Sequence, residues 1–415
     1  MNNRCFWLFM FAFLFGILLP VSAEEKILKI GTLFPLTGSC ALAGQRCKAA
    51  VETAVEIINN KHPEINVPLA AGEGVLGYKI QLVHADSQGK PDVGKSEAER
   101  LFDQENVYAI IGCYNSAVTK PASFVAERKK KIFVAGCSSS AALTERKMHY
   151  FFRLAPNDRI ESKEFCDFVQ WLNKNNSSNL KTLGLIYENT EFGKHAADEA
   201  KQIASKYEME VVVDVPFNPG ATNLNSEVTT LKDKNPDVIF GACLGGDYTL
   251  FIGTVNQQNW LPKVALNYCS GFQDPQISKQ LGEKGYYFAG ASGYSPDFVK
   301  IMPVAEAIEK LYKEKTGVPF DTDSILETVG MLVLGQAIEK AGTIDSEKVA
   351  ETLHKEEFVS PLSFGGKVTF DEQGQNNKAM SVVVQLQNGE YRRVYPPEYS
   401  TASVTFPIPS WDKRK

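Results

Sequence analysis

Short apolar runs alternate with longer stretches that carry apolar residues at helical spacing along most of the chain. The runs predict strands at 28–34, 79–83, 108–111, 132–135, 182–187, 210–215, 238–241 and 263–266. The longer stretches predict helices at 49–60, 93–102, 162–173, 194–207 and 223–232. Continuous apolar strands that alternate with amphipathic helices are typical of parallel sheets covered by helices on both faces. The pattern therefore predicts an α/β fold with doubly wound, parallel sheets.

The strand and helix series occurs twice, with a division near residues 150–158. Further helices are predicted at 304–315 and 324–341, and further β-like segments around 367–370 and 381–386. A single division would leave these elements unplaced, so we expect a return to the first lobe near 289–296 and a recrossing near 361–366. Three crossings form a hinge, and the cleft between the lobes is the expected ligand site. The predicted lobes are 24–155 with about 291–362, and 156–290 with about 363–415.

The N-terminal segment has the pattern of a secretory signal. Arg4 precedes an uncharged apolar run at 6–19, and the small residues Val21 and Ala23 follow it. This run is shorter than the ~20 residues that span a bilayer, so a membrane anchor is the weaker alternative. We expect cleavage after Ala23 and an exported, soluble, monomeric protein.

Composition and charge exclude other classes of protein. The 415 residues include 44 basic and 49 acidic side chains, which give a net charge of −5. This acidic balance argues against a protein that binds nucleic acid by neutralising phosphates. Ordinary proportions of apolar and charged residues, 44% and 22%, exclude disorder and coiled coils.

The cysteines do not follow a metal-binding or disulfide pattern. Seven remain after removal of the leader with Cys5, namely Cys40, Cys47, Cys113, Cys137, Cys166, Cys243 and Cys269. Their spacing is irregular, no CxxC occurs and the five histidines are scattered. We therefore expect dispersed core cysteines, no metal and no cofactor, although export leaves disulfides open.

Hydroxyl-bearing turns are the positive signal, since the motifs of serine hydrolases, zinc proteases and phosphate-binding loops are absent. Ser116 and Thr119 follow the strand at 108–111, and Ser139 follows the strand at 132–135. Open α/β sheets bind ligands beyond the carboxyl ends of their strands, and free N–H groups at helix starts attract carboxylates. A simpler alternative is that these hydroxyls only cap helices.

The sequence resembles a known family at these and other positions. The landmarks are Ile30-Gly31-Thr32-Leu33-Phe34-Pro35-Leu36-Thr37-Gly38, Asp86-Ser87-Gln88-Gly89, Leu143-Thr144-Glu145, Phe152-Arg153-Leu154-Ala155-Pro156 and Tyr187-Glu188-Asn189-Thr190-Glu191-Phe192-Gly193. In order and spacing they resemble the leucine/isoleucine/valine-binding proteins of branched-chain amino-acid ABC transporters. The resemblance implies a two-lobed periplasmic binding fold of class I with a three-segment hinge, a periplasmic location and a membrane permease as partner.

The resemblance also implies a set of ligand-binding residues. In the family, hydroxyls at the positions of Ser116 and Ser139 hold the ligand carboxylate. The residue matching Cys137 offers its backbone carbonyl to the ammonium group, and an aromatic residue matching Phe192 closes over the ligand from the second lobe. The neighbouring members of the first-lobe set are Asn115, Thr119 and Ser138.

One departure concerns the partner of the ligand's ammonium group. The family places an acidic residue near the position of Cys269, where this sequence has none. Asp247 and Asp274 are candidate substitutes, and Asp247 is equally well explained as a helix cap. Because relatives of this fold also bind amides, urea and aromatic acids, the ligand is predicted only as a small polar or carboxylate-bearing solute.

The sequence thus predicts a receptor that delivers a small solute to a permease and does no covalent chemistry. A first alternative is a subunit that presents the closed form to a signalling receptor. A second is an exported enzyme that uses a cleft thiol, Cys137 or Cys269, as its nucleophile.

Overall fold

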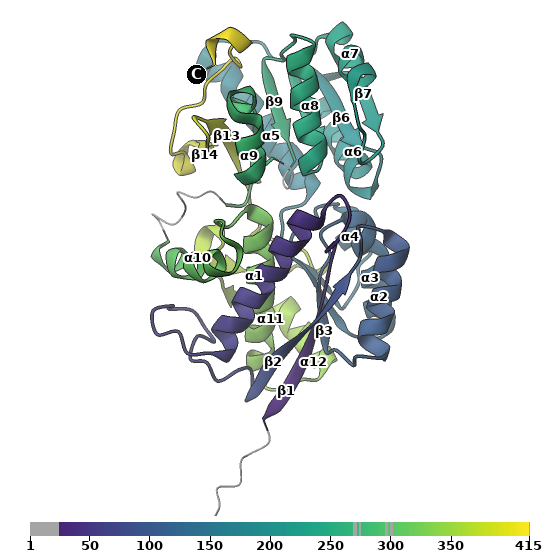
Figure 1. Cartoon of the computed structure of the whole chain (residues 1–415), viewed down its shortest axis with the longest axis vertical. Coiled ribbons are helices and arrows are strands. Elements are labelled where there is room, and N and C mark those ends of the chain that lie inside the picture. Colours follow the sequence, from purple (N-terminus) through teal and green to yellow (C-terminus); the bar gives the residue numbers. More distant parts are fainter. Residues whose placement is uncertain (1–24, 269–271, 274, 295–297, 299–301, 415) are drawn as a thin grey trace, which may run out of the picture.

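The fold consists of two α/β lobes, one above the other in Figure 1. The computed structural model describes residues 25–414 except 269–271, 274, 295–297 and 299–301. The predicted signal segment and Cys269 lie outside the described residues. No helix in the described ranges is long and apolar enough to cross a membrane.

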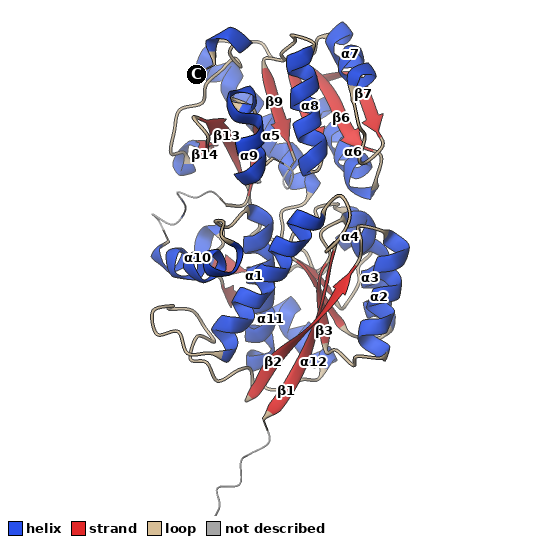
Figure 2. Ribbon diagram, in the orientation of Figure 1, coloured by secondary structure: helices blue, strands red, loops and turns tan. Residues whose placement is uncertain are grey.

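The first lobe contains a five-stranded parallel sheet in the order β2-β1-β3-β4-β5. Its strands are β1 (Lys26–Phe34), β2 (Tyr78–Asp86), β3 (Ala109–Gly112), β4 (Ile132–Ala135) and β5 (Phe151–Arg153). The helices threaded between them are α1 (Ala41–Asn59), α2 (Pro91–Asp103), α3 (Ser116–Arg128) and α4 (Ala142–Glu145). Alternate residues of the strands enter two separate apolar clusters, so helices cover both faces, as Figure 2 shows.

The second lobe contains a seven-stranded sheet in the order β14-β13-β10-β9-β8-β6-β7. Its strands are β6 (Thr182–Glu188), β7 (Glu210–Phe217), β8 (Val238–Ala242), β9 (Val264–Asn267), β10 (Ala289–Ser292), β13 (Val382–Gln387) and β14 (Glu390–Tyr395). Its helices are α5 (Asp158–Asn176), α6 (Glu191–Lys206), α7 (Asn225–Lys234), α8 (Gly245–Gln257) and α9 (Pro275–Leu281). The strands from β7 to β10 are parallel, whereas β13 and β14 pair antiparallel at the edge.

The remaining elements return to the first lobe after β10. They are α10 (Pro303–Thr316), α11 (Thr322–Ala341), α12 (Ser346–Lys355), β11 (Phe358–Val359) and β12 (Lys367–Val368). Helix α11 is buried along almost its whole length and packs against α1 beneath the first sheet. The strands β11 and β12 pair with each other in a small hairpin rather than joining either large sheet.

The eight predicted strands correspond to β1–β4 and β6–β9. The five helices predicted between them correspond to α1, α2, α5, α6 and α7. The sequence pattern does not predict strand β10, because Ala289-Gly290-Ala291-Ser292 contains small residues and lacks the β-branched residues that mark strands. The chain reaches the second sheet at β13, later than the predicted recrossing at 361–366. Residues up to Asn376 still bond to the first lobe, where the Asn376 N–H donates to the Arg153 carbonyl at 2.9 Å.

Arg153, at the end of β5, is the point where these segments meet. Its side chain is fully buried, and its Nε donates to Gln375 Oε1 at 2.7 Å. The other guanidinium nitrogens donate to Thr144 Oγ1 at 2.9 Å and to the carbonyls of Ser138 and Ser140. One cation therefore joins the first interlobe crossing, the turn after β4 and the last segment before β13.

Arg153→Met should lower the free energy of unfolding by about 3 kcal/mol, because several buried acceptors would lose their donor and each costs about 1–3 kcal/mol. Urea denaturation with an unchanged m-value would measure this loss. Arg128→Met is the matched control, since the Arg128 side chain is 54% exposed and contacts Glu99 at the surface. Equal stability losses in the two variants would contradict the role given to Arg153.

Candidate ligand-binding site

A cavity of about 320 Å³ lies between the two lobes. Its walls are formed mainly by segments that follow the carboxyl ends of β1, β3, β4, β6, β7 and β8. The first lobe contributes the turns after β1, β3 and β4 and the start of α11. The second lobe contributes the starts of α6 and α8 and residues of α9. This is the place where open α/β sheets bind their ligands, and its size suits a small solute.

Six of the sequence-predicted residues line this cavity, namely Asn115, Ser116, Cys137, Ser139, Phe192 and Asp247. Ser116 and Ser139 are buried in the first-lobe wall, with exposed fractions of 2% and 5%. Phe192 is the second residue of α6 and faces them from the second lobe. The structure thus brings together hydroxyls and an aromatic ring that are distant in sequence.

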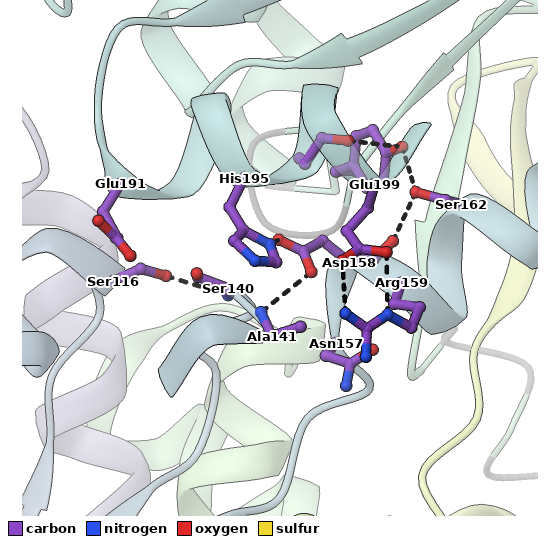
Figure 3. A network of polar contacts seen from close by, with 12 residues as sticks. Ser116, Ser140, Ala141, Asn157, Asp158, Arg159, Ser162, Glu191, His195 and Glu199 are labelled. Atoms are coloured by element: carbon purple, nitrogen blue, oxygen red, sulfur yellow. Dashed lines mark hydrogen bonds and ion pairs between the residues drawn. The ribbon is translucent and has the colours of Figure 1, made fainter. Parts of the chain in front are cut away.

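Ser116 is the first residue of α3, where unpaired backbone N–H groups give the helix terminus a partial positive charge. The backbone N–H of Ser140 donates to Ser116 Oγ at 3.3 Å, a contact drawn in Figure 3. This bond links the turn after β4 to the helix that follows β3. The corner can therefore present hydroxyl and backbone donors to one carboxylate.

The hydroxyls of Thr119 and Ser138 lie behind this wall and bond to each other at 2.6 Å. Ser138 Oγ also donates to the Cys113 carbonyl at 2.6 Å, and both side chains are almost completely buried. Neither residue is among the described cavity-lining residues. The two side chains hold the turns after β3 and β4 together, which positions Ser116 and Ser139.

The cavity also contains carboxylates that the sequence analysis did not assign. Glu188 is the last residue of β6, while Asp321 and Asp323 lie at the start of α11. None of the described lining residues is Lys, Arg or His. Glu188 stood in a family landmark, and Asp321 had the signature of a helix cap, which its side chain provides to Ser324. Together with Asp247 these side chains make the cavity strongly acidic.

Burial changes the ionisation of two of these carboxyls. Desolvation raises the pKa of Glu188 to about 7. The hydrogen bond from the Thr190 hydroxyl lowers this pKa, and the negative charge of Asp247 raises it further. Burial likewise raises the pKa of Asp247, which accepts a hydrogen bond from the Gly220 N–H at 3.4 Å. Leu244, not Asp247, is the cap residue of α8. Asp247 is therefore available to a ligand rather than committed to the helix terminus.

The described thiols lack the environment of a nucleophile. Burial raises the pKa of Cys40, and contact with Cys47 together with burial raises the pKa of Cys137 well above its usual value. A reactive cysteine needs a lowered pKa. Cys40, Cys47, Cys113, Cys137, Cys166 and Cys243 are all free cysteines. Among the described residues, nothing supports the alternative of a thiol enzyme.

Ion pairs join the lobes beside the cavity. Lys120 on α3 contacts Glu191 on α6 at 2.9 Å, and Arg159 on α5 contacts Glu145 on α4 at 2.6 Å. Figure 3 shows Glu191 from this rim, and Arg159 in the polar network beside it. These pairs span the two lobes and favour a closed arrangement, although exposed pairs contribute little individually.

A buried pair lies behind the rim. Asp158 at the start of α5 accepts a bond from the Ala141 N–H at 3.0 Å and pairs with His195 Nδ1 at 2.8 Å. Burial alone would lower the pKa of His195, but the hydrogen bond and charge of Asp158 outweigh it and raise that pKa. Glu199 and Glu145 act in the same direction, so the protonated ring is favoured.

Comparison with known proteins agrees with this geometry. The model of a family described as periplasmic binding protein matches residues 27–390. The Leu/Ile/Val-binding protein homolog 7 of Brucella suis is 26% identical over 94% of this chain and 95% of its own length. Homolog 8 of Brucella abortus is 25% identical over 91% of this chain and 93% of its own length.

Solved structures share the fold. The branched-chain amino-acid binding protein LivJ of Streptococcus pneumoniae, in complex with isoleucine, is 21% identical with a TM-score of 0.75 and covers 88% of this chain and 98% of its own. The leucine-binding protein LivK of Thermotoga maritima is 23% identical with a TM-score of 0.77, and the match covers 90% of this chain and 99% of LivK. A solute-binding protein of R. palustris in complex with benzoate is 16% identical with a TM-score of 0.76, and the match covers 89% of this chain and 96% of that protein.

His195→Asn should cost more stability at about pH 6.5 than at about pH 8.5. A histidine whose pKa rises on folding adds stability that is complete below its unfolded pKa of about 6.5 and disappears as pH rises through the folded value. Urea denaturation of both proteins at the two pH values would measure this. Asp158→Asn should remove the same pH-dependent part, and a stability loss that is independent of pH would contradict the pairing.

Proposed function

The chain belongs to the periplasmic binding protein family, and on that premise we propose that it is the solute receptor of an ABC importer. Members of this family bind solutes and are not enzymes. In this proposal the exported protein, cleaved after Ala23, captures its ligand outside the cytoplasm and presents it to a membrane permease. The observation that carries the proposal is the cavity between the lobes, whose walls come from strand ends of both.

The proposed ligand is an amino acid or a related compound with a carboxylate and an ammonium group. The first-lobe corner of Ser116, Ser139 and the α3 terminus offers donors, which suits an anionic group. Isoleucine and benzoate, bound by two relatives of the same fold, share a carboxylate. Across the cavity, Glu188 and Asp247 would receive the ammonium group in place of the missing acid near Cys269.

Ligand capture then works by bridging. A solute that touches Ser116 on one lobe and Phe192 on the other binds the closed form better than the open form, so binding shifts the population toward closure. The ion pairs between α3 and α6 and between α4 and α5 join the two lobes and would add to the stability of the closed form. The permease would recognise the closed form.

Native mass spectrometry of the purified protein, with a search for a co-purified solute of this class, tests the ligand assignment directly.

Ser116→Ala should weaken ligand binding by roughly 10- to 150-fold, because a hydrogen bond to a charged group contributes about 1.5–3 kcal/mol. Phe192→Ala should cause a similar loss through the apolar surface that no longer becomes buried on closure. Titration calorimetry measures both effects. Ser96→Ala on α2 and Phe124→Ala, which changes a residue that is 53% exposed, are matched controls expected to bind like the parent. Parental affinity of both cavity variants would overturn the site.

Asp247→Asn separates the ligand classes by charge. A ligand with an ammonium group should bind about 10- to 150-fold more weakly, since it loses a charged hydrogen-bond partner. The affinity of the parent protein for such a ligand should also fall as pH drops through about 7, where Glu188 becomes protonated. Glu188→Gln should remove this pH dependence of the affinity. Calorimetry between about pH 6 and 8 is the measurement. Unchanged affinity in both variants would show that the solute carries no cationic group.

A further inference from the structure

Three potential metal ligands meet beneath the floor of the cavity. Cys47 comes from α1, Cys137 from the turn after β4 and Glu327 from α11, and their ligand atoms all lie within 4.8 Å of one another. All three residues are buried, with exposed fractions of 0%, 6% and 0%. Figure 1 shows α1 and α11 side by side in the first lobe, which is how residues so distant in sequence come together.

The carboxylate in this cluster is incompletely bonded. Glu327 Oε1 accepts a weak hydrogen bond from Cys137 Sγ at 3.2 Å, and the backbone N–H groups of Gly136 and Cys137 also bond to the carboxyl group, whereas no hydrogen bond of standard geometry reaches the buried Oε2. A buried acceptor without a partner costs about 1–3 kcal/mol, so native structures seldom retain one without a reason. The Oε2 atom therefore has bonding capacity left for a ligand that the protein itself does not supply.

The backbone leaves room for this carboxylate. A Cβ built on Gly136 would lie 2.3 Å from the Glu327 carboxyl carbon and 2.5 Å from its Oε1. Glycine is thus required for the carboxylate to lie directly against the turn that carries Cys137. The contact orients the acid toward the two thiols rather than toward solvent.

We propose that Cys47, Cys137 and Glu327 form a binding site for a borderline-soft divalent cation of the Zn²⁺ class. Two sulfur ligands with one carboxylate oxygen match zinc, whereas Mg²⁺ and Ca²⁺ prefer oxygen ligands alone. Zn–S and Zn–O bonds of about 2.3 and 2.0–2.2 Å require the ligand atoms to approach by only small side-chain movements from their 4.8 Å limit.

The ion has a route to this site. Cys137 and Asp323 line the interlobe cavity, and Asp323 precedes Glu327 by one turn on the same face of α11. A cation attracted by the acidic cavity would therefore meet this cluster first at Cys137. Once bound, it would fasten α1, α11 and the turn of Cys137 together at the cavity floor.

Calorimetric titration of the reduced mature protein with Zn²⁺, without any organic solute, tests the proposal apart from the proposed function. We expect one ion per chain, and with Cd²⁺ as probe a sulfur-to-metal charge-transfer absorption. Glu327→Gln, which keeps the shape of the side chain, and Cys47→Ser should each weaken binding by at least about tenfold. Cys166→Ser and Cys243→Ser, which change buried thiols of the second lobe, are the matched controls and should bind like the parent.

Three outcomes would overturn the proposal. They are binding without the charge-transfer band, equal losses in the control variants, and a Cys47–Cys137 disulfide in protein purified without reductant, which would consume both sulfur ligands. Thermal unfolding of each variant without metal separates a lost site from a lost fold. Because Glu327→Gln introduces no change of volume, a folded Glu327→Gln protein with parental zinc affinity would be decisive against the site.

Discussion

The buried guanidinium of Arg153 is the interaction on which the arrangement of the site depends. Burial lowers its pKa to about 10, so it remains a cation at neutral pH and must be surrounded by acceptors. Those acceptors are the carbonyls of the turn after β4, the hydroxyl of Thr144 and the amide of Gln375. The same turn carries Ser139 and Cys137. One charge therefore sets both the path of the hinge and the position of the cavity wall.

The two sides of the cavity differ in chemistry, with hydrogen-bond donors on the first lobe and carboxyl groups on the second. Donors gather at the start of α3, while Glu188 and Asp247 face them from the second lobe, where burial raises the pKa of both carboxyls, that of Glu188 to about 7. The charge of Asp247 adds to the rise in the pKa of Glu188, and a ligand cation between them would offset that cost. Closure around a zwitterion would thus satisfy both walls together, which makes binding and lobe closure one process.

Neighbouring hydroxyls in the two turns have different roles. Ser139 faces the cavity, whereas Ser138 bonds to Thr119 and to the Cys113 carbonyl behind it. Successive residues in a turn point in different directions, and sequence spacing does not give those directions. The prediction from the sequence therefore located the correct segments and did not separate the residues that contact the cavity from those that position them.

The sequence by itself determined most of the strands and helices, the doubling of the α/β series and the segments that meet at the cleft, since these follow from local periodicity and from the rule that parallel sheets bind at their carboxyl ends. Only the tertiary structure decided the rest. The acids of α11 enter the cavity, and Cys137 meets Glu327 across 190 positions of the chain, because α11 packs beside α1 and against β4. Such contacts depend on how distant elements pack, and local patterns carry no information about that packing.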